Sequence, residues 1–291
     1  MEENRLTEYI PLKNDLLFHM VFTRNMAALK ALLSALLNIP EASIRQIEIL
    51  DPMQYSEAME SKLTILDLKV HLNDGAYILV EMQVRRFAYW TNRTVAYACR
   101  QVADQIHLGF DYDKLEPVIQ ISIMDHSLFP EHKRFFARYT PRDEEGYPYT
   151  DKLRFYVLDL TQIEAATEEQ REQGLVEWAR AFKATSWAEV NEIENTGVKE
   201  AAKTMEFILA NPTERDLIRM RQDAENDWIT MIRAAEREGE AKGKAEGEAK
   251  GEAKGKTEGK NEVARNMKRK GFHPTVISEL CGLNLEEVNA L

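Results

Sequence analysis

The spacing of apolar residues indicates a helical start followed by strands. From Lys13 to Leu37 apolar residues recur at helical intervals, and Asn14 is a suitable N-cap. The polar run at 23–25 interrupts this pattern, so one helix and two helices are both compatible with it. Residues 44–50 alternate like a short strand, and residues 51–61 are polar enough for a loop. We therefore expect a helical segment, a short strand and a loop.

Residues 63–84 predict a β-hairpin. They read LTILDLKVHLNDGAYILVEMQV, two apolar runs around Asn73-Asp74-Gly75, and this composition is typical of a hairpin turn. A helix is expected at 93–109, a strand buried on both faces at 117–124, and further strands at 135–139 and 153–160. The order helix, three strands, helix, strand predicts an α/β fold with a mixed sheet.

The turn geometry decides where two acids of this hairpin lie. A two-residue loop at Asp74-Gly75 would set Asp67 opposite Met82 and leave Glu81 on the other face. A three-residue loop with Gly75 in the left-handed region would instead set Asp67 directly opposite Glu81. We favour the three-residue loop, because Asn and Asp suit a type I turn.

A carboxylate pair across a ladder needs a compensating charge, because like charges opposite each other destabilise a sheet. A divalent cation is the simplest candidate, and Mg²⁺ prefers hard oxygen ligands such as Asp67 and Glu81. Gln83 shares their face, since strand side chains alternate. The competing interpretation is that both acids lie at a wet sheet edge and have no chemical role.

The charges suit nucleic-acid binding in one segment but not over the chain as a whole. The 291 residues carry a net charge of −11, which argues against a protein that coats nucleic acid. Between Glu81 and Asp104, however, there is no acid, and aromatic residues accompany four arginines: Arg85, Arg86, Arg93 and Arg100. This segment suits a phosphate backbone, or alternatively a charged helix whose aromatic residues turn into the core.

Three stretches together resemble a known family. PLKNDLLFHMVF, the hairpin NDGAYILVEMQ and RTVAYACRQVADQIHLGFDYDKLEPVIQISI are similar to the Rpn family of recombination-promoting nucleases, PD-(D/E)xK nucleases also described as transposases. The similarity covers most of residues 8–240. It implies a restriction-endonuclease-like core with the order αβββαβ, in which the second strand supplies Asp and the third supplies Glu-x-Lys. The matching residues are Asp67 and Glu81-Met82-Gln83.

The resemblance also implies roles for these residues. Asp67, Glu81 and the backbone carbonyl of Met82 would bind the metal, and Gln83 would take the place of the usual Lys. A neutral amide can orient a water but supplies no positive charge, so Arg85 is a candidate for that charge.

Support from the flanking helices is expected as well. Nucleases of this fold often add an acid from the first helix, here Asp15, although the helix dipole alone favours an acid there. Gln101 and Gln105, four residues apart, would support the site, or face solvent. Arg86 and Arg93 would help to hold DNA.

The sequence as a whole predicts four regions: a nuclease-like core (1–160), a helical region packed on it (161–238), a repeat (239–260) and a small helical tail (261–291). The repeat has Gly at every fourth position and is rich in Glu and Lys. Each interior Gly costs a helix about 1 kcal/mol, so we favour a partly helical linker over a helix stabilised by self-association. The tail has a helix-turn-helix outline, but Glu286 and Glu287 suit a major groove poorly.

These observations predict a Mg²⁺-dependent endonuclease acting on double-stranded DNA in recombination or in mobile-element or phage-related processing, with Mn²⁺ or Ca²⁺ as other candidate ions. The alternative is a DNA-binding or oligomerising adaptor that retains the fold without cleavage. No apolar run approaches the roughly 18 residues of a membrane span, and the N-terminus lacks the form of a signal peptide. We therefore expect a cytoplasmic homo-oligomer that assembles through its C-terminal region.

Overall fold

The computed structural model describes residues 8–50, 68–72, 75–86 and 88–291. Its strands are β1 (Ile47–Ile49), β2 (Leu68–Leu72), β3 (Ala76–Gln83), β4 (Val118–Met124), β5 (Phe136–Tyr139) and β6 (Leu153–Asp159). Its longer helices are α1 (Asp15–Arg24), α2 (Met26–Leu37), α3 (Trp90–Ala103), α5 (Leu175–Lys183), α7 (Thr196–Ala210) and α8 (Pro212–Arg269). Its shorter helices are η1 (Glu41–Ser43), η3 (Tyr112–Lys114), η4 (Leu160–Ala165), α4 (Glu168–Glu172), α6 (Trp187–Asn191), α9 (Pro274–Cys281) and α10 (Leu285–Ala290).

The described strands form one mixed six-stranded sheet in the order β1-β2-β3-β4-β6-β5. Strands β1, β2 and β3 are an antiparallel meander, whereas β3, β4 and β6 run parallel and β5 pairs antiparallel with β6. Helix α3 connects β3 to β4, as a parallel pair requires a crossover. The mixed α/β fold with the order αβββαβ is therefore confirmed, apart from the division of the first helix into two.

The hairpin has the three-residue connection that the sequence favoured. Leu72 pairs with Ala76 and Leu68 with Val80, and Gly75 has φ +79°. That left-handed conformation is the one in which a Cβ would be strained. Asn73 and Asp74 lie outside the described residues. The register places Leu79 opposite Lys69 and Val80 opposite Leu68. Glu81 is the next residue along β3.

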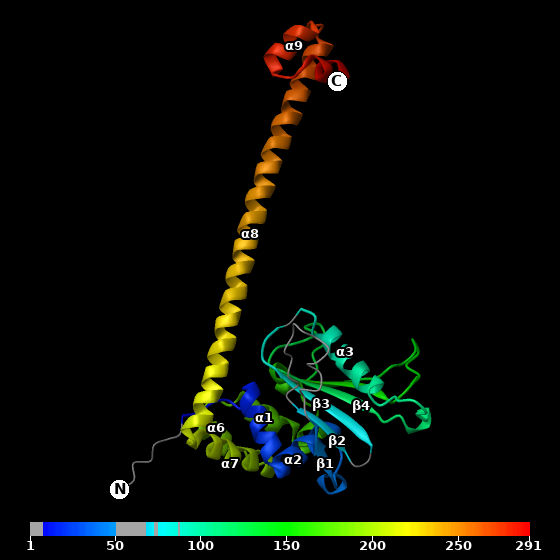
Figure 1. Ribbon diagram of the computed structural model, residues 1–291, viewed down its shortest axis with the longest axis vertical. Helices are drawn as coiled ribbons and strands as arrows, with labels where there is room; N and C mark the ends of the chain where they lie inside the picture. Colours follow the sequence, from blue (N-terminus) through cyan, green and yellow to red (C-terminus); the bar gives the residue numbers. More distant parts are fainter. Residues whose placement is uncertain (1–7, 51–67, 73–74, 87) are drawn as a thin grey trace, which may run out of the picture. The chain divides into compact units, whose positions relative to one another are not determined.

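Two layers of helices cover the sheet (Figure 1): α3 lies on one face, and α1, α2, α5 and α7 lie on the other. Along β3, Ile78, Val80 and Met82 face the larger helical layer and belong to the main core. Leu79 instead packs against Ala98 of α3. Because side chains alternate along a strand, Glu81 and Gln83 lie on the α3 face with Leu79.

Local sequence explains the first helical layer. Asn14 caps α1 by accepting a hydrogen bond from Leu17 N at 3.0 Å, as predicted. Asn25 ends α1 and caps α2 by accepting from Ala28 N, so the polar run divides two helices. Their apolar faces then pack into the main core. Among the described residues no single helix is long and apolar enough to cross a membrane; α1 and α2 reach that length and composition only jointly, across a 107° bend.

Two predicted elements have different bounds. The first strand is shorter than 44–50, because only Ile47–Ile49 pairs with β2. Helix α3 begins before residue 93 and ends well before Gly109. Beyond its end, Gln105 donates to the carbonyl of Glu116 and accepts from the Glu116 amide, which ties the departing chain to the segment before β4.

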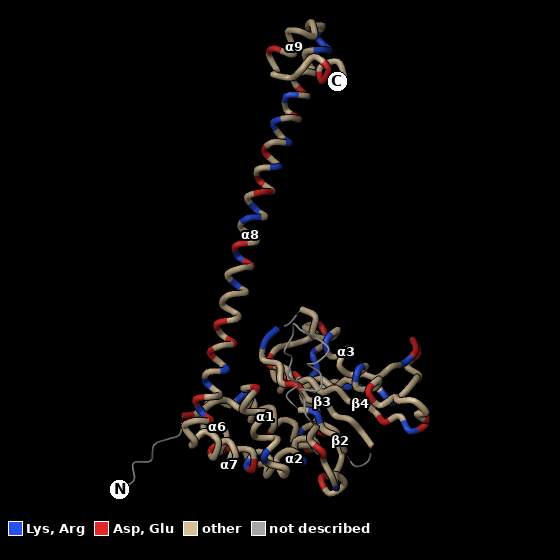
Figure 2. Tube along the Cα trace, viewed as in Figure 1, with Lys and Arg blue, Asp and Glu red and all other residues tan. Residues whose placement is uncertain are grey.

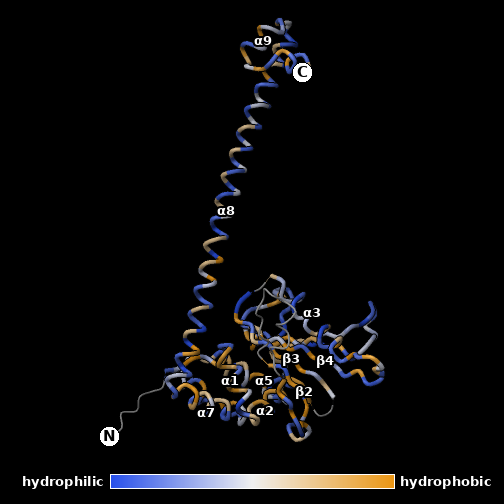
Figure 3. The backbone as a smooth tube through the Cα atoms, in the orientation of Figure 1, coloured by the Kyte–Doolittle hydropathy of each residue, from blue (hydrophilic) through white to orange (hydrophobic). Residues whose placement is uncertain are grey.

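The chain divides into two compact units, residues 1–222 and 223–291. The second unit contains most of α8. Residues 239–260 lie entirely within this helix, so the favoured prediction of a partly helical linker is wrong. Lys and Arg are interspersed with Asp and Glu along α8 (Figure 2), and its colouring is mostly hydrophilic (Figure 3). Glu252 and Lys256, four residues apart on this helix, form an ion pair at 2.6 Å.

The end of the second unit is a small helical module. Ile277, Cys281 and Val288 form its core with Ala264 and Leu283. Asn284 and Glu287 form a capping box at the start of α10. Gly282, in the left-handed region, ends α9.

Candidate active site

Glu81 is the centre of the candidate site. It lies on β3 with its side chain 3% exposed. Arg93 Nη2 of α3 donates to its Oε1 at 3.1 Å, and Gln120 Nε2 of β4 donates to its Oε2 at 3.4 Å. Burial raises the pKa of Glu81 to about 7, against the opposing effect of the Arg93 charge and hydrogen bond. Near neutral pH this carboxyl therefore exists in both protonation states.

Polar side chains surround Glu81 on the α3 face of the sheet. Ser122 is the partner of Glu81 in the β3–β4 register and is buried. Ser122 Oγ accepts a hydrogen bond from Trp90 Nε1 at 3.2 Å. Gln120 Oε1 is buried and has no hydrogen-bond partner among the described residues. An unsatisfied amide oxygen beside a buried carboxylate is costly in a folded protein unless another group engages it.

The sequence interpretation missed Gln120 and Ser122, although a signal for them was present. Both interrupt the apolar run PVIQISIM two residues apart, so they share one face of the strand. Lys69 on β2 was also missed. It is 5% exposed on the same sheet face, and burial lowers its pKa while Asp104 opposes that shift.

Gln83 lies on the same face of β3 as Glu81 and is half-buried. Its Nε2 donates to the carbonyl of Arg85 at 2.6 Å, which fixes the side chain toward the end of the strand. The side chain of Met82 faces the main core, as its backbone position between Glu81 and Gln83 requires.

The remaining predicted residues come from α1, from α3 and from the segments that follow α3 and β3. Asp15 accepts from Leu16 N at 2.7 Å and from Arg221 Nε at 2.9 Å, on the helical layer opposite α3. Gln101 is buried on α3, and Gln105 is bonded to Glu116 as described above. Arg86 follows β3 and lies near His126. Burial lowers the pKa of the His126 imidazole, and the charge of Arg86 lowers it further.

Asp67 lies outside the described residues, so its predicted position opposite Glu81 stays a prediction. It precedes Leu68, whose partner is Val80, and Glu81 follows Val80. Within the described part of the chain no group of three His, Cys, Asp or Glu is placed to hold a metal ion. Among the described residues, the Glu81 carboxylate and the Gln120 amide oxygen lie together on this face, and their chemistry fits a hard cation such as Mg²⁺.

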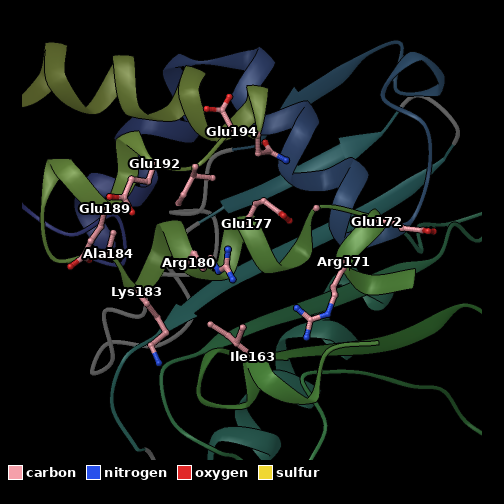
Figure 4. Close-up of a pocket in the computed structure, with 13 residues that line it drawn as sticks. Ile163, Arg171, Glu172, Glu177, Arg180, Lys183, Ala184, Glu189, Glu192 and Glu194 are labelled. Atoms are coloured by element: carbon pink, nitrogen blue, oxygen red, sulfur yellow. The ribbon is translucent and has the colours of Figure 1, made fainter. Parts of the chain in front are cut away.

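A separate pocket of about 820 Å³ lies among η4, α4, α5 and the segment that leads to α7 (Figure 4). None of the predicted site residues lines it. Its charged lining consists of Glu172, Glu177, Glu189, Glu192, Glu194, Arg171, Arg180 and Lys183. Acids outnumber bases, so this pocket suits a polyanion poorly.

Comparison with known sequences decides the family. A sequence model described as "PD-(D/E)XK nuclease family transposase" matches residues 12–235, well over half of the chain. The chain belongs to this family. The match ends within α8 and spans every residue that the sequence predicts for the site. No curated protein and no solved structure matches the chain significantly.

Proposed function

We propose that this PD-(D/E)XK family member is a Mg²⁺-dependent endonuclease that hydrolyses phosphodiester bonds in double-stranded DNA, in recombination or in mobile-element or phage-related processing. The observation that carries the proposal is a buried Glu81 beside the unsatisfied oxygen of Gln120 on the one polar face of the sheet. Burying these two polar groups opposes folding. The nuclease chemistry that family membership implies supplies a reason for their burial.

The site residues divide into metal ligands and residues that orient the water or the DNA. Glu81, Asp67 and the carbonyl of Met82 would hold the metal, and Gln120 Oε1 adds a fourth candidate oxygen. A bound Mg²⁺ supplies a more acidic water and positive charge at the phosphate, and Mn²⁺ and Ca²⁺ are further candidates. Gln83 would orient the attacking water through its amide.

The other predicted residues act around these ligands. Arg85 and Arg86, directly after β3, would contact the DNA backbone, since Arg binds phosphate by paired hydrogen bonds. Gln101 and Gln105 would support α3 rather than the chemistry. Asp15 would join the site only by exchanging its Arg221 partner.

Self-association through the C-terminal unit is part of the proposal. Helix α8 exposes Trp228, Met231 and Ile232, and a Cβ added at any of its six repeat glycines would meet nothing within 4 Å. A long helix with so many glycines gains little from exposed ion pairs. A second copy of α8 would bury the apolar residues and stabilise the helix.

The test is plasmid cleavage. Supercoiled plasmid is incubated with purified protein in Mg²⁺, Mn²⁺, Ca²⁺ or EDTA, beside Asp67→Ala, Glu81→Ala and the control Glu48→Gln, an exposed acid of β1 in the same sheet. We expect nicking in Mg²⁺ or Mn²⁺ that EDTA and the first two variants abolish and the control retains. A gel shift without nicking in every metal would replace the enzyme by a DNA-binding adaptor.

A further inference from the structure

Both carboxylate oxygens of Glu81 are engaged by protein groups. Arg93 holds Oε1 and Gln120 holds Oε2. A cation that binds this carboxylate must therefore share or replace at least one of them. Gln120 is neutral and its hydrogen bond is long, whereas Arg93 carries a full positive charge at 3.1 Å. Two cations on one carboxylate oxygen repel each other, so Arg93 is the group that competes.

Arg93 is better placed to move than Glu81. Its side chain is 23% exposed, against 3% for Glu81, so one end of the ion pair reaches solvent. Its guanidinium lies 5.3 Å from the ring centroids of both Trp90 and Tyr97. These residues are three before and four after Arg93 on α3, which places both rings beside it on one helix face. Contact with aromatic faces stabilises a guanidinium independently of Glu81.

The aromatic support is itself fixed to the sheet. Trp90 is 2% exposed, and its Nε1 donates to Ser122 Oγ. Ser122 is the strand partner of Glu81. Arg93, Trp90, Ser122 and Glu81 thus form a closed ring of contacts through α3, β4 and β3. This ring holds the guanidinium at the carboxylate, while the Arg93 side chain as a whole keeps 23% of its surface exposed.

We propose that Arg93 is a positioning residue that exchanges partners, pairing with Glu81 in the free protein and with a DNA phosphate when a divalent cation binds Glu81. This inference rests on the proposed function. The phosphate brings the negative charge that Arg93 loses when the cation engages Glu81. A guanidinium binds phosphate oxygens as readily as carboxylate oxygens, so the exchange keeps its hydrogen bonds.

The exchange makes cation binding and DNA binding cooperative. Without DNA, Arg93 competes with the cation, and the cation binds weakly. DNA removes that competition by engaging Arg93, so the cation binds more tightly, and by reciprocity the cation strengthens DNA binding. Coupling of this kind between two sites typically changes affinity by roughly 5- to 150-fold.

The experiment measures Ca²⁺ affinity by calorimetry with and without a short DNA duplex. The proteins are the full chain, Arg93→Gln, Arg93→Lys and the control Lys203→Gln, which removes one exposed positive charge from α7 on the opposite helical layer. We expect tighter Ca²⁺ binding with DNA in the wild type and in the control. Arg93→Gln should bind Ca²⁺ with nearly the same affinity in both conditions, and Arg93→Lys should retain part of the difference. Thermal melting of each variant verifies folding.

The outcomes separate this inference from the proposed function. If Glu81→Gln abolishes Ca²⁺ binding but Arg93→Gln keeps the wild-type dependence on DNA, the metal site stands and the exchange by Arg93 is wrong. If the wild type binds Ca²⁺ in neither condition, the exchange fails, and plasmid cleavage in Mg²⁺ or Mn²⁺ decides separately whether the proposed nuclease stands. An equal loss of coupling in Lys203→Gln would reduce the effect to general charge and would also overturn the proposal.

Discussion

Strands β3 and β4 present apolar side chains to one face of the sheet and a mixture of polar and apolar side chains to the other. Toward α1, α2, α5 and α7 they contribute only apolar residues, which join a continuous core: Ile78, Val80, Met82, Ile119, Ile121 and Ile123. Toward α3 they contribute Leu79 and Val118, and then Glu81, Gln120 and Ser122.

The polar side chains on the α3 face are as well buried as the apolar ones opposite. Six of the seven buried polar or charged residues identified in the described part of the chain lie between the sheet and α3: Lys69, Glu81, Thr94, Gln101, Gln120 and Ser122. Burying polar groups costs free energy unless hydrogen bonds compensate, and here Gln120 Oε1 has none among the described residues. One face therefore supplies stability, and the other buries polar side chains at a cost to stability.

The largest effect on stability should come from the apolar face. Ile121 is fully buried in the main core, so Ile121→Ala removes apolar contacts and leaves a cavity. We expect the free energy of unfolding to fall by about 2–5 kcal/mol, measured by urea denaturation. The control is Ser122→Ala on the adjacent position, which removes one hydrogen bond with Trp90 and should cost about 1 kcal/mol. Equal losses for both variants would contradict the difference between the faces.

The pH dependence of stability should come from the polar face. The pKa of Glu81 is about 7 in the folded protein and 4.5 ordinarily, so the folded state binds its proton more tightly. Stability from this group is full below about pH 4.5 and is lost as the pH rises through about 7. The loss should be on the order of 3 kcal/mol in EDTA, from 1.36 kcal/mol per pKa unit.

Glu81→Gln isolates that contribution, because an amide of the same shape does not titrate. The difference in unfolding free energy between wild type and Glu81→Gln should change over this pH range, measured by urea denaturation at a series of pH values. Ile121→Ala, on the other face, should leave the pH dependence as in the wild type. A pH-independent difference between wild type and Glu81→Gln would show that burial does not perturb the carboxyl.

The apolar face and the hairpin were largely predictable from sequence. Helical spacing with Asn14 and Asn25 indicated the first layer, and the turn at Gly75 fixed the register that the structure confirms. These features depend on neighbours within a few residues. Local patterns therefore determine them, and the polarity of Glu81 in an apolar strand was visible in the same way.

The partners of Glu81 could not be predicted in the same way. Arg93 and Gln120 lie 12 and 39 residues away, and their approach depends on how α3 packs across β3 and β4. The end of α3 was misplaced for a similar reason, because Gln105 bonds the distant Glu116 instead of continuing the helix. Arg85 stays a predicted source of positive charge at the site, and the structure adds Arg93, whose guanidinium bonds Glu81.

The smallest effect on stability should come from Gln120, although its effect on function should be clear. Gln120→Leu removes a 3.4 Å hydrogen bond and an unsatisfied buried oxygen together, and replaces them by an apolar group of similar size. Replacing both polar atoms of a weak contact by apolar atoms is nearly neutral, so urea denaturation should show a change within about 1 kcal/mol. If Gln120 Oε1 is a cation ligand, calorimetry should show Ca²⁺ affinity reduced at least severalfold.

Gln120→Glu sharpens the same comparison by placing a second carboxylate beside Glu81. Without Ca²⁺ this variant should be less stable than the wild type, because two buried carboxylates repel each other. Ca²⁺ should restore its melting temperature more than it raises that of the wild type, since binding to the folded state alone stabilises it. A Gln120→Leu protein that loses more than about 2 kcal/mol yet binds Ca²⁺ like the wild type would instead assign Gln120 to packing, and the polar face would then be structural at this position.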